Sequence, residues 1–186
     1  MDAQQVTARI DRPIVLLGMM GAGKSALGVR LAEALGLAFA DADAEIEKAA
    51  QMNIADIFEQ HGEAAFRDGE RRVIKRLLEG PPHILALGGG AFVNDETRSL
   101  VLEKAVSIWL DVPLDELVAR VERKPHKRPL LIGHNVRDKL QELLETRSAA
   151  YSEAALKVDV GSGSHEAAVA RLVEALDAHL AAPLDK

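Results

Sequence analysis

The chain has no cysteine, fewer basic than acidic residues and no long apolar run, and each shortage narrows what the protein can be. Without cysteine it has neither a disulfide framework nor a thiolate metal site, which is typical of a reducing cytoplasm. The formal net charge of −6 argues against a nucleic-acid-binding or membrane-binding protein. No apolar run approaches the ~18–20 residues of a membrane span, and the first dozen residues lack the apolar region of a signal peptide. We therefore expect a soluble, cytoplasmic protein with neither nucleic acid nor membrane as a partner.

Short apolar runs alternate with segments of helical periodicity along the chain, without internal repeats. The predicted strands are residues 13–18, 37–41, 83–88, 105–112 and 156–160. Helices are predicted after the first strand up to Gly36, from a cap at Asn53 to near Gly62, from there to Gly80, and over residues 114–121, 136–150 and 165–181. This alternation predicts an α/β fold of three layers, in which a five-stranded parallel sheet is covered by helices on both faces. In such sheets, ligands bind beyond the carboxyl ends of the strands.

One domain is expected over residues 12–181. Residues 1–11 are predicted to be a disordered N-terminal arm, and residues 182–186 a short tail. A monomer is the expected state.

The sequence GMMGAGKS at residues 18–25 matches the phosphate-loop pattern G-x-x-x-x-G-K-[ST] between a predicted strand and a predicted helix. Glycines let backbone N–H groups surround a phosphate, and the helix N-terminus adds partial positive charge. Lys24 would reach the β- and γ-phosphates of a nucleotide, and the Ser25 hydroxyl would hold Mg²⁺. A chance glycine-rich turn is the alternative, and the strand before it and helix after it argue against that. The predicted nucleotide contacts of the loop are Gly21, Ala22, Gly23, Lys24, Ser25 and Ala26.

Two acids, Asp41 and Asp43, lie at the end of the second predicted strand. On an extended strand this spacing puts both carboxylates on one side. One carboxylate would then hold magnesium-bound water while the other accepts a proton from a substrate hydroxyl. The alternative is a helix start, where aspartate is favoured as an N-cap or first-turn residue. These residues alone favour neither interpretation.

Gly88, Gly89 and Gly90 follow the third predicted strand. Three consecutive glycines are costly in backbone entropy, so either the turn needs positive φ or something must come very close to that backbone. If close approach is the reason, the position of these glycines at the carboxyl end of a central strand predicts that their backbone N–H groups contact a ligand.

Taken in order, GMMGAGKS, DADAEIE, IADIFEQHGEAAFRDGE, LALGGGAF and RPLL closely resemble the shikimate kinase family over roughly residues 12–160. The resemblance implies transfer of the ATP γ-phosphoryl group to the 3-hydroxyl of shikimate, with Mg²⁺ as cofactor. It also implies a P-loop kinase fold like that of nucleoside monophosphate kinases. A substrate-binding subdomain would lie at about residues 42–80 and a lid at about residues 123–136.

The resemblance assigns the acceptor side of the site. It implies that Asp43 faces the reacting hydroxyl, that Asp41 is a second-shell magnesium ligand, and that Arg67 and Arg147 bind the shikimate carboxylate. Arginine suits that task because its planar fork pairs with a carboxylate through two hydrogen bonds. Glu70, one turn after Arg67, would orient it. The alternative for each arginine is a surface ion pair. The implied substrate-binding residues are Asp43, Arg67, Gly88, Gly89, Gly90 and Arg147.

The resemblance also assigns the nucleotide side. Arg128 would close from the lid over the ATP phosphates, and Arg120 would lie near the adenine. Together with Lys24 and Asp43, Arg128 would form the catalytic set. Two departures from the family pattern concern only the nucleotide. Ala26 lacks the hydroxyl that many relatives have, and residues 158–167 lack a basic residue against the adenine.

Two other functions remain open on these residues. Another small-molecule P-loop kinase, acting on gluconate or a nucleoside monophosphate, would share the fold, ATP and the lid. A nucleotide-binding regulator would bind ATP without hydrolysing it. Release of ADP in the presence of shikimate separates these functions.

Overall fold

A computed structural model describes residues 3–123, 131, 133–161 and 163–182. Its strands form one parallel sheet with the order β2-β3-β1-β4-β5. Their bounds are β1 Ile14–Leu17, β2 Ala38–Asp41, β3 His83–Ala86, β4 Val106–Asp111 and β5 Leu156–Asp159. The predicted α/β class and the five parallel strands are confirmed.

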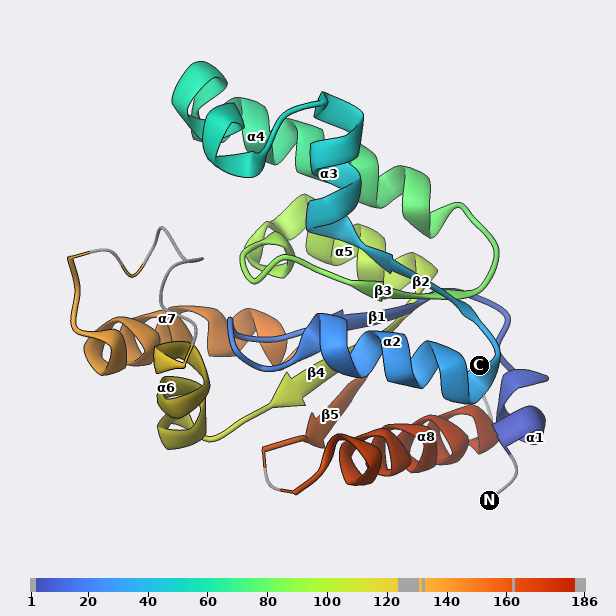
Figure 1. The fold of residues 1–186 in the computed structure, drawn as a ribbon. Coiled ribbons are helices and arrows are strands. Elements are labelled where there is room, and N and C mark those ends of the chain that lie inside the picture. Colours follow the sequence, from blue (N-terminus) through green and yellow to red (C-terminus); the bar gives the residue numbers. More distant parts are fainter. Residues whose placement is uncertain (1–2, 124–130, 132, 162, 183–186) are drawn as a thin grey trace.

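Helices cover both faces of this sheet (Figure 1). Their bounds are α1 Ala3–Thr7, α2 Lys24–Leu35, α3 Ala42–Ala50, α4 Ile54–Leu78, α5 Asp95–Lys104, α6 Leu114–Glu122, α7 Val136–Tyr151 and α8 His165–Ala181, with a 3₁₀ turn η1 at Ala91–Val93. Helices α2 and α8 lie together on one face, and α5 and α7 lie on the other (Figure 1). Among the described residues, no helix is long and apolar enough to cross a bilayer.

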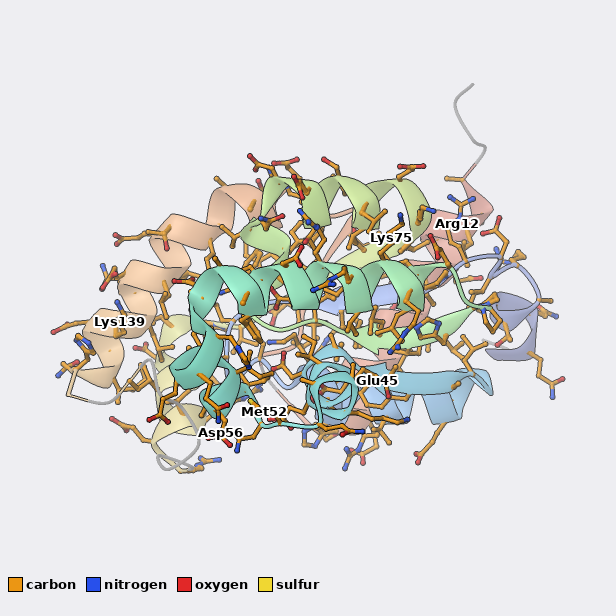
Figure 2. All side chains as sticks on the ribbon, turned by 90° about the horizontal axis from the view of Figure 1, so that it is seen from above. Arg12, Glu45, Met52, Asp56, Lys75 and Lys139 are labelled. Carbon is orange, nitrogen blue, oxygen red and sulfur yellow. The ribbon has the colours of Figure 1, made fainter. Side chains whose placement is uncertain are left out.

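The core is centred on β1, the middle strand. All four of its residues, Ile14–Leu17, are buried, as expected for a parallel strand with helices on both faces. Both neighbouring strands pair with β1 in parallel register, so the carboxyl ends of the central strands meet at one edge of the sheet. Figure 2 shows Met52, Asp56 and Lys139 toward that end of the molecule, and Arg12, which precedes β1, toward the other.

Helix α4 is bent where the sequence predicted a break. Gly62 has non-helical backbone angles, φ 79° and ψ 173°, inside an otherwise continuous helix. The sequence analysis did not predict α5, whose only buried residues are Thr97 and Val101. Because only two residues of α5 are buried, the sequence of this segment shows little of the apolar periodicity that predicts a helix.

Residues 3–11 differ from the disordered arm that was expected. They contain α1, in which Val6 is fully buried, and Ile10 is also buried. The Thr7 hydroxyl donates to the carbonyl of Leu35 at the end of α2, with an oxygen–oxygen distance of 2.8 Å. Arg9 pairs with Asp177 of α8. Two apolar residues one turn apart are too few to give a clear helical pattern in the sequence. The segment forms a helix because α2 and α8 provide an apolar surface against which it packs.

We expect Val6→Ala to lower the free energy of unfolding by about 2 kcal/mol, because two buried methyl groups are lost and a cavity remains. Urea denaturation followed by circular dichroism measures the change. Gln5→Ala, at an exposed position on the same helix, is the matched control and should have little effect. Equal stabilities for the two variants would show that α1 does not dock.

Candidate active site

The loop between β1 and α2 has a backbone that requires glycine. Gly18, Gly21 and Gly23 have positive φ angles of 147°, 83° and 92°. A Cβ atom on Gly18 would also lie 2.9 Å from the carbonyl oxygen of Leu110. Few other residues tolerate such angles. The spacing of glycines that defined the sequence motif therefore corresponds to a specific loop conformation.

The N-terminus of α2 is left without a side-chain cap. Its N-cap is Gly23, and α6 likewise begins without a side-chain cap at Pro113, whereas five other helices are capped by a side chain. Those caps are Asp41 for α3, Asn53 for α4, Asn94 for α5, Asn135 for α7 and Ser164 for α8. Lys24 folds back over the loop, and its Nζ donates to the carbonyl oxygens of Gly18 and Met19 at 2.9 and 3.1 Å. A phosphate placed here meets backbone N–H groups, the positive end of the helix and an ammonium group.

The two carboxylate oxygens of Asp41 accept hydrogen bonds from different parts of the chain. Oδ1 accepts from the backbone N–H groups of Asp43 and Ala44 at 3.0 and 3.4 Å and so caps α3. Oδ2 accepts from the Ser25 hydroxyl at 2.6 Å. The extended spacing assumed for the two acids is wrong, because β2 ends at Asp41 and Asp43 lies in the first turn of α3. The helix-start interpretation is correct for the backbone, and the hydrogen bond from Ser25 joins this helix start to the beginning of α2.

Asp43 points toward the glycine turn after β3. A Cβ atom on Gly88 would lie 2.7 Å from Asp43 Oδ1 and 3.4 Å from Glu70 Oε1. Burial raises the pKa of the Asp43 carboxyl, as does the nearby charge of Asp41, while Lys24 acts in the opposite direction. Asp43 is therefore a partly desolvated carboxylate with a raised proton affinity, which suits a proton acceptor.

Each of the three glycines stands against a different side chain. Besides the contact of Gly88 with Asp43, a Cβ on Gly89 would lie 2.9 Å from Arg147 Nη1, and one on Gly90 would lie 2.9 Å from Arg67 Nη2. None of the three glycines has a positive φ angle. Close approach, and not a special backbone conformation, is therefore the reason for glycine at this turn.

Arg67 is held by two carboxylates on its own helix. Its Nη1 lies 2.7 Å from Glu70 Oε2, and its Nε lies 3.8 Å from Glu63 Oε1. Only 3% of the Glu70 side chain is exposed, compared with 34% of Arg67. Burial raises the pKa of Glu70, and the hydrogen bond from Arg67 opposes that shift. The expected pair with Glu70 is present, and the exposed part of the arginine remains available to an anion.

The sequence analysis missed Tyr151, the last residue of α7. Its side chain is fully buried, and its hydroxyl donates to the carbonyl oxygen of Gly89. The only signal in the sequence was its position one helical turn after Arg147, which places both side chains on one helix face.

Arg120 lies on the nucleotide side, between two loops. Its guanidinium donates to the carbonyl oxygens of Gly21 and Ala22, each at 3.3 Å, and to that of Gly161 at 2.9 Å. It also pairs with Glu116 on the preceding turn. Arg120 therefore connects the phosphate loop to the loop between β5 and α8.

A cavity of about 820 Å³ joins the phosphate loop, the two acids, Arg120 and the first two of the three glycines, while Arg67 and Arg147 are not among the residues that line it. It is lined by residues 20–27, Asp41, Asp43, Leu87, Gly88, Gly89, Glu116, Arg120, Arg123, Val160, Gly163, Ser164, His165 and Ala168. The cavity extends from the phosphate loop to Asp43 in one direction and to the β5–α8 loop in the other. Arg128 and most of the expected lid lie outside the described residues.

Known proteins that resemble the chain agree on one family. The shikimate kinase family model matches residues 20–177. The chain is 54% identical over 165 residues to the shikimate kinase of Caulobacter vibrioides, with 89% of this chain and 82% of the relative covered. It is 50% identical over 173 residues to that of Zymomonas mobilis, with 93% and 98% covered.

Solved structures agree with the sequence relatives. A shikimate kinase from Acinetobacter baumannii in complex with shikimate has a TM-score of 0.86 and 32% identity, with 93% of this chain and 97% of that chain covered. A gluconokinase from Sinorhizobium meliloti has a TM-score of 0.60 and 23% identity over 93% of each chain, which shows a shared fold alone. From its family match and its relatives, this chain belongs to the shikimate kinase family.

Proposed function

We infer that the chain is an ATP-dependent kinase that phosphorylates shikimate, and we propose a role for each group of its site. The observation that carries the assignment is the convergence of Asp43, Arg67 and Arg147 on three consecutive glycines. Two arginines and a raised-pKa carboxylate around a bare backbone suit an acceptor with an anionic group at one end and a hydroxyl at the other.

The acceptor carboxylate binds between Arg67 and Arg147. The two guanidinium groups lie next to consecutive glycines, Gly90 and Gly89, although they come from different helices. Glu70 restricts the orientation of Arg67 by a 2.7 Å contact. The backbone of Gly88, Gly89 and Gly90 forms the floor of this acceptor site, where a side chain would displace the arginines or Asp43.

The nucleotide phosphates bind at the phosphate loop. Backbone N–H groups of residues 21–26 and the Lys24 ammonium surround the β- and γ-phosphates. Arg120 stands at the adenine end of the cavity, and the residues after β5 add backbone contacts. We keep Arg128 and the lid at about residues 123–136 as part of this proposal, together with the substrate-binding subdomain at about residues 42–80.

The Ser25–Asp41 pair fits Mg²⁺. A hydroxyl and a carboxylate 2.6 Å apart are hard oxygen donors, and they lie beside the loop that receives the phosphates. The described residues hold no cluster of three or more His, Cys, Asp or Glu that would form a complete metal cage. Mg²⁺ commonly takes one or two protein oxygens together with phosphate oxygens and water, so this sparse set suits it. The ion would supply charge neutralisation at the transferred group.

The chemical step needs position and charge compensation more than covalent chemistry. The 3-hydroxyl oxygen forms a bond to the γ-phosphorus while the bond to the ADP oxygen breaks. Asp43 orients that hydroxyl and takes its proton, which the raised pKa of its carboxyl favours. Lys24 and Arg128 neutralise the charge on the transferred phosphoryl group.

We keep a monomer as the working unit of this proposal. The use of ATP and the absence of cysteine support a cytoplasmic location.

The acceptor assignment is tested by ADP release from Mg·ATP. We expect release to depend on shikimate and to stay at background with gluconate or nucleoside monophosphates. Removing Mg²⁺ with EDTA should abolish it, and excess Mg²⁺ should restore it. Equal rates with gluconate would support the related sugar-acid kinase, and tight ATP binding without release would support a regulator.

We expect Asp43→Asn to lower kcat about 10²- to 10⁴-fold, because the amide cannot take a proton. Binding of ATP and shikimate, measured by calorimetry, should change little. Glu45→Gln, in the same first turn of α3, is the matched control and should keep its activity. A near-normal kcat in Asp43→Asn would remove Asp43 from the mechanism.

The same variant should be more stable than the native chain at pH 7. The folded-state pKa of Asp43 lies above its ordinary value of 3.8, so the folded state binds this proton more tightly than the unfolded state. That contribution is present below the ordinary value and is lost as the pH rises through the folded-state pKa. Asparagine does not ionise and so avoids this loss. In urea denaturation experiments, the difference in the free energy of unfolding between the variant and the native chain should shrink as the pH is lowered.

We expect Gly89→Ala to raise the KM for shikimate by about tenfold or more, a loss of 1.4 kcal/mol or more in binding. The new Cβ would lie 2.9 Å from Arg147 Nη1 and would displace that flexible side chain, while the fold and the KM for ATP should be preserved. Gly69→Ala, on α4, is the control, because its Cβ would meet nothing within 4 Å. A rise in the KM for ATP alone would move the glycines to the nucleotide site.

A further inference from the structure

Tyr151 connects the acceptor turn to the helix that supplies Arg147. Its hydroxyl donates to the carbonyl oxygen of Gly89, a residue 62 positions earlier in the chain. Helix α7 also packs against η1, the turn that begins directly after the three glycines. One hydrogen bond therefore joins the end of α7 to the middle glycine of the acceptor site.

The phenol is fixed on both sides. Its ring lies against that of Trp109 on β4, with centroids 5.8 Å apart, and the side chain has no exposed surface. Burial raises the pKa of the Tyr151 hydroxyl, while Arg147 opposes the shift through its charge and its hydrogen bonding to the phenol. A phenol oxygen both donates and accepts, so it can serve Gly89 and Arg147 together.

A second contact holds the same two segments together. Arg98 of α5 donates from Nη1 to the carbonyl oxygens of Phe92 and Val93, at 3.4 and 3.1 Å. Its Nε lies 3.1 Å from Glu153 Oε1, two residues beyond Tyr151. Arg98 therefore supports the general position of the turn, and Tyr151 is the contact made to Gly89 itself.

We propose that Tyr151 is a positioning residue of the acceptor site, which fixes the Gly89 backbone and the Arg147 guanidinium in the geometry that receives the shikimate carboxylate. The inference rests on the proposed role of Arg147. A purely structural role would predict a loss of stability without a selective effect on one substrate. A positioning role predicts weaker shikimate binding with unchanged ATP binding.

The test compares Tyr151→Phe with Thr7→Val. Both variants remove a hydroxyl that donates to a backbone carbonyl, and Thr7 does so at the end of α2 that lies away from the phosphate loop. Both should lower the melting temperature. Tyr151→Phe should also raise the KM for shikimate about three- to tenfold, the range expected for one hydrogen bond, and leave the KM for ATP unchanged. Thr7→Val should leave both KM values unchanged.

A double-mutant cycle with Arg147→Lys tests the path. If Tyr151 acts through Arg147, adding Tyr151→Phe to Arg147→Lys should raise the KM for shikimate far less than it does in the native chain. Unchanged shikimate KM in Tyr151→Phe, equal rises for both substrates, additive effects in the cycle or an unfolded variant would each overturn the proposal. If Arg147→Lys itself left the shikimate KM unchanged, the proposed acceptor role of Arg147 would fail first, and this inference with it.

Discussion

The acceptor site that we propose depends on a stretch of backbone that carries no side chains. Three helices bring charged groups to it, with Asp43 from α3, Arg67 from α4 and Arg147 from α7. Each group approaches one glycine to within a distance that a methyl group would occupy. The close approach of these three groups to the main chain therefore depends on the absence of a Cβ atom at each of the three positions.

Burial of charge is the second constraint, because a carboxylate that is partly removed from water lowers the stability of the folded chain. Asp43 and Glu70 are both partly desolvated, and burial is the largest cause of the raised pKa of each. Glu70 is compensated by Arg67, whereas Asp43 faces Asp41 as well as Lys24. Perturbed acids of this kind gather at catalytic sites because a proton acceptor needs an affinity above that of a solvated carboxylate.

The sequence predicted those parts of the molecule that are encoded locally. The phosphate loop was identified because its glycines have backbone angles that other residues avoid, and the strands because parallel strands are apolar throughout. The sequence left Asp43 open between a strand end and a helix start, and the structure decides for the helix, since a cap at Asp41 turns the chain into a helix directly after β2 ends. Tyr151 was missed because its partner is 62 residues away and only the folded chain brings the two together. Helices α1 and α5 were missed because neither buries a complete amphipathic face.

The position of α1 and α8 decides where the chain tolerates attached groups. Thr7 of α1 bonds to the last residue of α2, and Arg9 pairs with Asp177 near the end of α8. The phosphate loop lies at the opposite end of α2, about 18 Å away for a helix of 12 residues at 1.5 Å each. An affinity tag, a fusion partner or a linker to a solid support joined near residue 3 or residue 181 would lie at the end of the molecule opposite the loop between β1 and α2 (Figure 1). The same proximity would let a short peptide join these two ends in a circularly permuted chain, with new termini opened elsewhere on the surface.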